Sequence, residues 1–360
     1  MSAMCRRCVL LVAAVLLGAT GSLAQVPPMY QIVTVADWPP EFHNPKMNNH
    51  GQIVFVGWYD PSDRRTEEIF LYDHGQLIRL TDDYIQDVGA AINDDGTIVW
   101  SRGLGPPDPD DGEPLLQIVL WRDGVLTQLT DTAYDECVGS LNNLGHVVWD
   151  EQKDEEPAGW STNIRFYDGY EIHEITNDNS SHRNPVINDD DWIVWTRYNF
   201  CVEPWTSDTM LYANGEIAAL TEGQTEPTAP AINNHGQVVW HSYNPLTGLK
   251  EIHLWESGQT TLLTDWGMNA RINDHGDVYF IRWHEVGRVY QAWLYLRGTF
   301  YQLTDDPFWN VDGDINNAGA ATWQSGDFPG SDIRYLHPAP PRAEPIGGAL
   351  GAQDVRPRLP

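Results

Sequence analysis

The sequence predicts an all-β protein, a seven-bladed β-propeller built from four-stranded blades. Three observations support this fold class. An Asn-x-x-Gly motif followed by a short apolar strand recurs along the chain. The spacing between recurrences is that of a four-stranded propeller blade. Finally, the last repeat lacks one strand, and the N-terminal segment supplies a strand of the missing type.

The motif occurs seven times, with Asp191 in place of Gly in the fourth copy. The first asparagine of each copy is Asn48, Asn93, Asn142, Asn188, Asn233, Asn273 and Asn316. The intervals are 45, 49, 46, 45, 40 and 43 residues, too long for a leucine-rich repeat and typical of a propeller blade. We therefore expect one blade per copy.

Each repeat is expected to form four strands, A to D, of which the fifth copy is a clear example. Strand A covers residues 230–233 and ends at the motif asparagine, and strand B covers residues 237–240. The turn that joins strands A and B contains Asn and Gly, which accept the positive φ of a tight hairpin turn. Strand C covers residues 252–255, and strand D ends in Leu263-Thr264. This order predicts an antiparallel meander in every blade.

An aromatic residue closes the short strand B segment of every copy. These residues are Phe55, Trp100, Trp149, Trp195, Trp240, Phe280 and Trp323. They could form a ring that stacks on sugars or a cofactor. Large rings at one register of a buried strand are, however, typical core residues. We interpret them as packing between neighbouring blades.

The two ends of the repeat region complement each other. The last copy ends with a strand C at residues 333–336 and has no strand D, whereas residues 31–37 match the strand D segment 76–82. Pairing of residues 31–35 beside 333–336 would close the ring and cover edges that promote aggregation. The propeller domain is therefore expected to span residues 25–336.

Residues 1–24 have the order of a secretory signal peptide. Arg6 and Arg7 precede an apolar run at residues 9–17, and small residues lead to Ala24. Export to the periplasm or the extracellular space follows. No later segment has the roughly 20 apolar residues of a membrane-spanning helix, so we expect no membrane insertion. We also expect a monomer. The Pro-, Gly- and Ala-rich tail at residues 337–360 is expected to be disordered.

Export places Cys137 and Cys201 in an oxidising compartment. Cys137 begins strand A of one blade, and Cys201 follows strand B of the next. Because neighbouring strands are antiparallel, both positions lie on the same face. A disulfide is one outcome, provided that the Cα atoms come within about 7 Å; two free thiols are the other.

The chain carries 51 Asp and Glu against 21 Lys and Arg, a formal charge of −30. This charge excludes a nucleic-acid-binding protein. Acidic residues gather in the loops between strands D and A, where they would attract cations or a basic partner or serve solubility in a saline habitat. Residues 108–113 resemble a Ca²⁺ loop but lack the remaining ligand spacing. We predict no metal and no cofactor.

The Asn-x-x-Gly, Leu-Tyr/Trp and Leu-Thr signatures resemble two repeat families over about residues 30 to 336. One is the TolB-like propeller, whose blades carry Pro-x-Trp-Ser-Pro-Asp-Gly and Leu-Thr. The other is the bacterial extracellular HAF repeat, with Ile-Asn-x-x-Gly-x-Val-Val. This chain has Asn where TolB has Ser-Pro, and Trp where HAF repeats usually have Gly. The resemblance implies a secreted or periplasmic propeller and no defined activity.

The sequence contains no Gly-x-Ser-x-Gly elbow, His-Glu-x-x-His helix, phosphate-binding loop or dinucleotide fingerprint. Our main expectation is therefore a non-catalytic propeller that binds a protein, a glycan or a small ligand. The alternative is a carbohydrate-active enzyme such as a polysaccharide lyase. His43 and His182 are the better histidine candidates, because they fall near the loops where propellers usually bind ligands.

The strongest candidate site lies at the predicted axis. Residues two and four places before the motif asparagine are mostly small, and the charged ones all lie in three blades that ring closure makes consecutive. The candidate ligand-binding residues are Asn44, Lys46, Asn269, Arg271, Asp312 and Asp314, with His43 at the rim. They would form either a structural ion-pair cluster or a site for a small anionic or sugar-like ligand.

Overall fold

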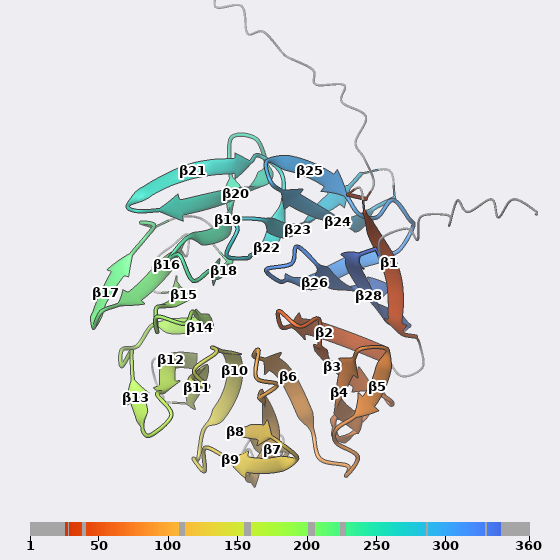
Figure 1. The fold of residues 1–360 in the computed structure, drawn as a ribbon. Coiled ribbons are helices and arrows are strands. Elements are labelled where there is room, and N and C mark those ends of the chain that lie inside the picture. Colours follow the sequence, from red (N-terminus) through yellow and green to blue (C-terminus); the bar gives the residue numbers. More distant parts are fainter. Residues whose placement is uncertain are drawn as a thin grey trace, which may run out of the picture.

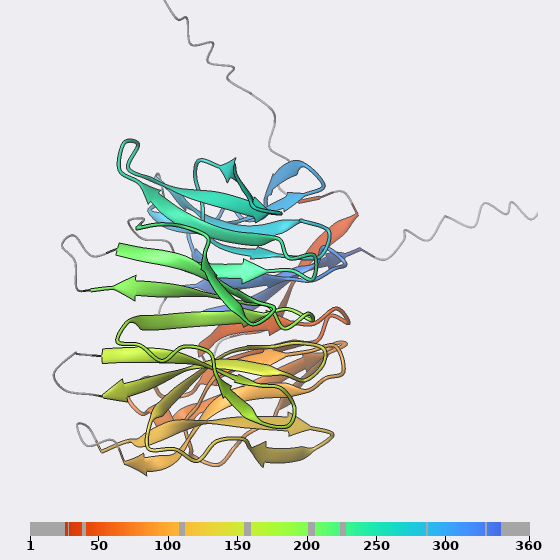
Figure 2. The same ribbon diagram turned by 90° about the vertical axis from the view of Figure 1, so that its left-hand side faces the viewer.

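The computed structural model describes residues 26–27, 29–37, 41–107, 112–154, 160–200, 206–223, 228–285, 287–327 and 330–339. These residues form 28 strands and one short 3₁₀ turn, η1 (Arg64–Thr66). The predicted all-β class is confirmed. Figure 1 shows the sheets arranged around a common axis, and Figure 2 shows their strands running from one face of the molecule to the other.

Five sheets have four strands each, and the motif asparagine follows the first strand of each repeat. Three of them are β2 (Glu41–Met47), β3 (Ile53–Trp58), β4 (Glu67–Asp73), β5 (Gln76–Arg79); β6 (Asp87–Ile92), β7 (Ile98–Pro107), β8 (Pro114–Arg122), β9 (Val125–Gln128); and β18 (Thr228–Ile232), β19 (Val238–Asn244), β20 (Leu249–Glu256), β21 (Gln259–Thr264). The other two are β22 (Met268–Ile272), β23 (Val278–His284), β24 (Val289–Leu296), β25 (Thr299–Gln302); and β26 (Trp309–Ile315), β27 (Ala321–Gly326), β28 (Ser331–Pro338), β1 (Tyr30–Ala36).

The sixth sheet has eight strands and contains two repeats. They are β10 (Asp135–Leu141), β11 (Val147–Asp154), β12 (Trp160–Tyr167), β13 (Ile172–Glu174); and β14 (Ser181–Ile187), β15 (Ile193–Asn199), β16 (Thr206–Ala213), β17 (Glu216–Ala219). A single parallel pair, Thr162 with Ser181, joins the two repeats. All other pairings within each repeat are antiparallel, as the predicted meander requires.

The N-terminal strand β1 lies beside the C-terminal strand β28 in the sheet (Figure 1). Ile32 faces Leu336 and Thr34 faces Arg334 in an antiparallel register. The Arg334 guanidinium also donates a hydrogen bond to Thr34 Oγ1 at 2.5 Å. Strand β28 ends at Pro338, two residues beyond the predicted end of the domain.

Each motif asparagine holds its own turn and the next repeat together. Asn188 Oδ1 accepts hydrogen bonds from the main-chain N–H groups of Asp190 (3.1 Å) and Trp192 (2.9 Å). Its Nδ2 donates to the main-chain carbonyl of Asn233 at 3.0 Å. Only a side chain with both a donor and an acceptor can do this, which explains why the position is Asn in every repeat.

We call the seven motif asparagines the asparagine belt, because each side chain bonds the next asparagine's carbonyl and the cycle returns to its start. Its last bond runs from Asn316 Nδ2 to Asn48 O at 3.1 Å. The next residue in each repeat forms a second cycle through main-chain N–H to side-chain Oδ1 bonds. These residues are Asn49, Asp94, Asn143, Asp189, Asn234, Asp274 and Asn317.

The innermost strand of every repeat contains a β-bulge before the motif asparagine. In six repeats the bulged residue, four places before the asparagine, has positive φ. These residues are Asn44, Gly89, Asn184, Ala229, Asn269 and Asp312. Gly, Asn and Asp tolerate this conformation best. The inner strands are also crowded: a Cβ on Gly139 would collide with the main-chain oxygen of Pro185.

The seven strand B aromatics are core residues, as predicted. All are at most 2% exposed, and they pack in the clusters between neighbouring sheets. They lie inside their strands rather than at the ends. For example, β15 continues for four residues beyond Trp195. Strand B is therefore longer than the sequence pattern indicates.

Candidate active site in the central channel

The innermost strands surround a central cavity of about 560 Å³, which we call the channel. Every repeat contributes wall residues, and both hydrogen-bonded cycles lie along it. Six of the seven predicted site residues line this one cavity. They are Asn44, Lys46, Asn269, Arg271, Asp312 and Asp314. His43 is in β2 beside Asn44, but it is not among the lining residues.

Lys46 lies in the channel wall with its side chain half-buried. Among the described residues its ammonium group makes no hydrogen bond and no ion pair within 4.0 Å. Burial first, and then the charge of Arg271, lower the pKa of Lys46 from 10.5 to about 8, and Asp314 and Asp312 oppose this shift. The channel therefore holds an amine that is partly neutral near neutral pH.

Asp314 is engaged with the backbone. Its Oδ2 accepts the N–H of Met47 at 3.0 Å, and its Oδ1 accepts the N–H of Ile315 at 3.0 Å. Arg271 donates to the carbonyl of its neighbour Ala270 at 2.9 Å. Within the described part of the chain, no ion pair of 4.0 Å or less joins Arg271, Lys46, Asp312 or Asp314. The charged groups are close, yet they are not the ion-pair cluster that the sequence also allowed.

Two polar atoms near this charged sector have no hydrogen-bond partner among the described residues. Tyr279 is fully buried with its hydroxyl unpaired, and burial raises its pKa well above 10, with Asp312 adding to the shift. His43 Nε2 is 4.0 Å from Glu67 Oε1 and also unpaired. Burial lowers the pKa of His43, and Asp312 opposes that shift. We expect His43 to be neutral at pH 7.

The wall formed by β10 and β11 carries a thiol and a carboxyl that the sequence reasoning did not assign to the channel. Cys137 and Asp150 are cross-strand partners and line the cavity. Burial raises the pKa of Asp150 to about 7, opposed by Arg183 and an N–H of Asn184. Desolvation by the surrounding protein, together with Asp150, raises the pKa of the Cys137 thiol to about 12. The only sequence feature that distinguishes Asp150 is that it is the one carboxylate directly after a strand B aromatic.

Cys137 carries a free thiol in the structure. Cys201 lies outside the described residues, so the Cys137–Cys201 disulfide stays a prediction. The Ca²⁺-like loop at residues 108–113 also falls largely outside them.

Several residues expected at the ligand-binding face are buried instead, which corrects that expectation. His182 is 2% exposed and lies in β14, where Trp195 Nε1 donates to its Nδ1 at 2.8 Å. Asp87 and Glu136 belong to the acidic residues expected in the loops between strands D and A, but they accept the indole N–H of Trp100 (2.6 Å) and Trp149 (3.3 Å). The physical reason is that strand A begins earlier than expected, so its first residues pair with the core tryptophans.

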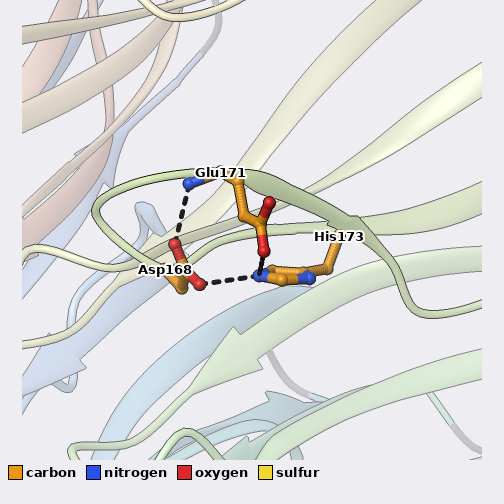
Figure 3. A group of neighbouring side chains, drawn as sticks. All are labelled: Asp168, Glu171 and His173. Atoms are coloured by element: carbon orange, nitrogen blue, oxygen red, sulfur yellow. Dashed lines mark hydrogen bonds and ion pairs between the residues drawn. The ribbon is translucent and has the colours of Figure 1, made fainter.

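A second group of titratable side chains lies in the turn between β12 and β13 (Figure 3). His173 Nε2 is 2.7 Å from Asp168 Oδ2 and 3.8 Å from Glu171 Oε1. Asp168 Oδ1 also accepts the N–H groups of Tyr170 and Glu171. These bonds lower the pKa of Asp168. The group could hold a metal ion, but its contacts already account for it as a turn cap.

No family model matches the chain, and no curated protein is similar to it. Among solved structures, the acylaminoacyl peptidase of Pyrococcus horikoshii matches with a TM-score of 0.59 and 16% identity, over 81% of this chain and 52% of that one. The β-propeller domain of the Trilobed protease from Pyrococcus furiosus matches with a TM-score of 0.59 and 13% identity, over 84% and 94%. TolB from Acinetobacter baumannii has a TM-score of 0.46 and 12% identity, over 79% and 63%.

The likeness to the β-propeller domain of the Trilobed protease shows a propeller-type fold. The chain spans about half the length of the acylaminoacyl peptidase it matches. The expectation of a non-catalytic binding propeller is contradicted, because the leading neighbours with this fold are peptidases. The HAF-type resemblance finds no counterpart among them. Among the described residues, no helix is long and apolar enough to cross a membrane.

Proposed function

We propose that the chain is a seven-bladed propeller closed by β1, and that its channel is the active site of a carbohydrate-active enzyme. The closure is supported by the β1–β28 pairing and by the asparagine belt, whose seventh bond returns to Asn48. The enzyme proposal rests on Lys46, an amine with lowered pKa in the channel wall beside a guanidinium.

The best-supported reaction is β-elimination on a uronic acid residue of a polysaccharide. Arg271 is a cationic group in the channel wall of a chain of charge −30, and it favours an anionic substrate group beside it. Arg271 would pair with the sugar carboxylate and stabilise the negative charge that develops when its α-carbon loses a proton. Neutral Lys46 would take that proton, because a base with a pKa near the working pH is the most effective.

The step balances without a co-reactant. Lys46 removes the C5 proton, the electron pair forms the C4–C5 double bond, and the C4–O4 bond breaks. The ammonium that has formed then returns a proton to the leaving oxygen. The products are a shortened chain and an unsaturated uronate end, and Lys46 is again neutral.

Hydrolysis by two carboxyl groups is less well supported. A glycosidase needs one carboxyl as acid and a second as base or nucleophile. Asp314 has both oxygens occupied by main-chain N–H groups, so Asp312 lacks a free carboxylate partner in this sector. The Lys46–Arg271 pair needs no second carboxylate.

The test is a screen of the purified protein on uronic-acid polysaccharides, read as ultraviolet absorbance of new unsaturated ends. We expect the Lys46→Met variant to lose at least about 100-fold in rate, as for removal of a general base. The rate of the parent protein should rise with pH up to about 8, since only neutral Lys46 accepts a proton.

The matched control is Lys250→Met, because Lys250 lies in β20 and is not among the cavity-lining residues. Its rate should equal that of the parent. Absence of unsaturated ends across acidic polysaccharides at pH 6 to 9 would contradict the proposal, as would full activity of Lys46→Met.

The place of action and the partners follow from the same proposal. We propose that residues 1–24 direct export and that the enzyme works as a monomer in the periplasm or outside the cell, where acidic polysaccharides are accessible. Its partner is then the glycan substrate.

A further inference from the structure

Aromatic side chains gather where two neighbouring repeats meet, at the start of β26. Trp309 has its ring centroid 5.5 Å from that of Tyr290 and 6.0 Å from that of Trp283, and the latter two are 5.1 Å apart. We call these three residues, with the adjacent Phe308, the aromatic rim. Trp309 and Phe308 are each 41% exposed.

The rim differs from the aromatic core in how its rings are placed. The core rings are at most 2% exposed, whereas the rim leaves apolar area open to solvent. The rings of Trp283, Tyr290 and Trp309 contact one another edge to face, at interplanar angles of 61° to 67°. Exposed rings that form one contiguous apolar patch are typical of binding surfaces, whereas single scattered apolar residues are not.

The backbone under the rim is firmly held. Asn310 is fully buried, and its Nδ2 donates to Asp306 Oδ1 at 3.0 Å and to the carbonyl of Phe308 at 3.0 Å. Its Oδ1 accepts the indole N–H of Trp323 at 3.1 Å. Trp309 is therefore presented by a rigid strand end, which reduces the ordering cost of binding.

The rim lies on the same strand as part of the proposed active site. β26 begins at Trp309 and carries Asp312 and Asp314 into the channel wall. At about 3.3 Å per residue, Asp312 lies about 10 Å along the strand from Trp309. The neighbouring inner strand, β22, supplies Arg271. An extended ligand that enters the channel at this sector would therefore pass over the rim.

We propose that the aromatic rim is a subsite for the part of an acidic oligosaccharide that extends out of the channel, with Trp309 stacking on a sugar ring. This proposal rests on the proposed function for the identity of its ligand. Sugar rings present a flat C–H face to an aromatic ring, while the carboxylate of Asp306, which is bonded to Phe308 N–H, suits sugar hydroxyl groups better than an apolar protein surface.

The test uses Lys46→Met protein, which leaves the ligand uncleaved, and measures dissociation constants for galacturonate and for tetragalacturonate by calorimetry. We expect Trp309→Ala to weaken tetragalacturonate binding at least ten-fold and to leave the affinity for the single sugar unchanged. Trp309→Tyr should restore most of the affinity, because it restores an aromatic face. Phe308→Ala, a change at an exposed side chain, should weaken the tetrasaccharide less than Trp309→Ala does.

The control is Tyr170→Ala, which removes a 94% exposed aromatic from the β12–β13 turn; it should bind like the parent. Equal tetrasaccharide affinity of the Lys46→Met protein with and without Trp309→Ala, both folded, would overturn the rim proposal. This holds whether or not the unmutated protein cleaves uronates. Loss of affinity on Trp309→Ala, together with a lack of unsaturated ends from the unmutated protein, would support the rim and count only against the lyase reaction. Absence of tetrasaccharide binding by the parent would overturn the rim as a saccharide site.

Discussion

The asparagine belt and the channel wall are built from the same seven strands, yet they differ in how strictly the sequence repeats. In the belt, all seven residues are Asn, and every one makes the same bond to the next repeat. Two residues earlier, the wall carries Lys46, Arg271 and Asp314 in three consecutive repeats and small or apolar residues in the other four. Repeated residues meet a need of the fold, and departures from the repeat mark positions open to function.

The largest effect should come from removing β1, since its repeat has no other fourth strand. Deleting residues 30–36 would uncover Ile333 and Leu336, which are fully buried, and leave β28 as an unpaired edge. We expect loss of cooperative thermal unfolding by circular dichroism. A synthetic peptide of residues 30–36, added in excess, should restore it. A truncated protein that melts cooperatively at the parent temperature would show that the pairing does not close the fold.

The belt and the wall can be compared within one strand. Asn188→Ala removes one donor to Asn233 and leaves two main-chain N–H groups of its own turn unpaired, so we expect a loss of about 2–3 kcal/mol in the free energy of unfolding. Asn184, four residues earlier in β14, has φ of 56° and makes no side-chain hydrogen bond in the described part of the chain. Asn184→Gly should therefore be nearly neutral. Urea unfolding of both variants measures the loss in the free energy of unfolding. Equal losses would show that the belt position and the wall position contribute equally to the fold.

The sequence predicted the repeated features well because they follow from local chemistry. The positions of Asn188 and Trp195 are set by turn geometry and by burial, which act in every repeat. The sequence also placed Lys46 and Arg271 at the axis, because period-2 alternation projects them inward. It did not show the bulge that gives Asn44, Asn269 and Asp312 positive φ, so part of their polar character serves the backbone rather than a ligand.

Other misses have a tertiary cause. His182 and Glu136 resemble loop residues, since nothing in the local pattern shows that strand A begins there and pairs with a buried indole. Asp150 enters the channel because its strand B crosses beside the inner strand of the next repeat, where an N–H of Asn184 reaches it. Tertiary contacts determine the positions of these residues, and the local sequence pattern of a single repeat does not show such contacts.

The smallest expected effect is a gain in stability when the wall loses its charge. Burial lowers the pKa of Lys46 to about 8 in the folded protein, against 10.5 when unfolded. Below pH 8 the amine is charged in both states, and the folded state bears the full cost of keeping that charge from water. One pKa unit corresponds to about 1.4 kcal/mol, which sets an upper bound of roughly 3 kcal/mol; water in the channel should reduce the cost to about 1 kcal/mol.

Lys46→Met should therefore unfold at higher urea concentration than the parent at pH 7, while losing activity. As pH rises from 8 to 10.5, the folded parent releases its proton before the unfolded chain does, so parent stability rises relative to the variant and the difference should vanish. The measurement is urea unfolding of both proteins at pH 7, 9 and 10, with Lys250→Met as the control that should show no such trend. A variant less stable than the parent at pH 7 would mean that Lys46 supports the fold through Asp312 and Asp314, as the belt asparagines do, and that the wall is structural after all.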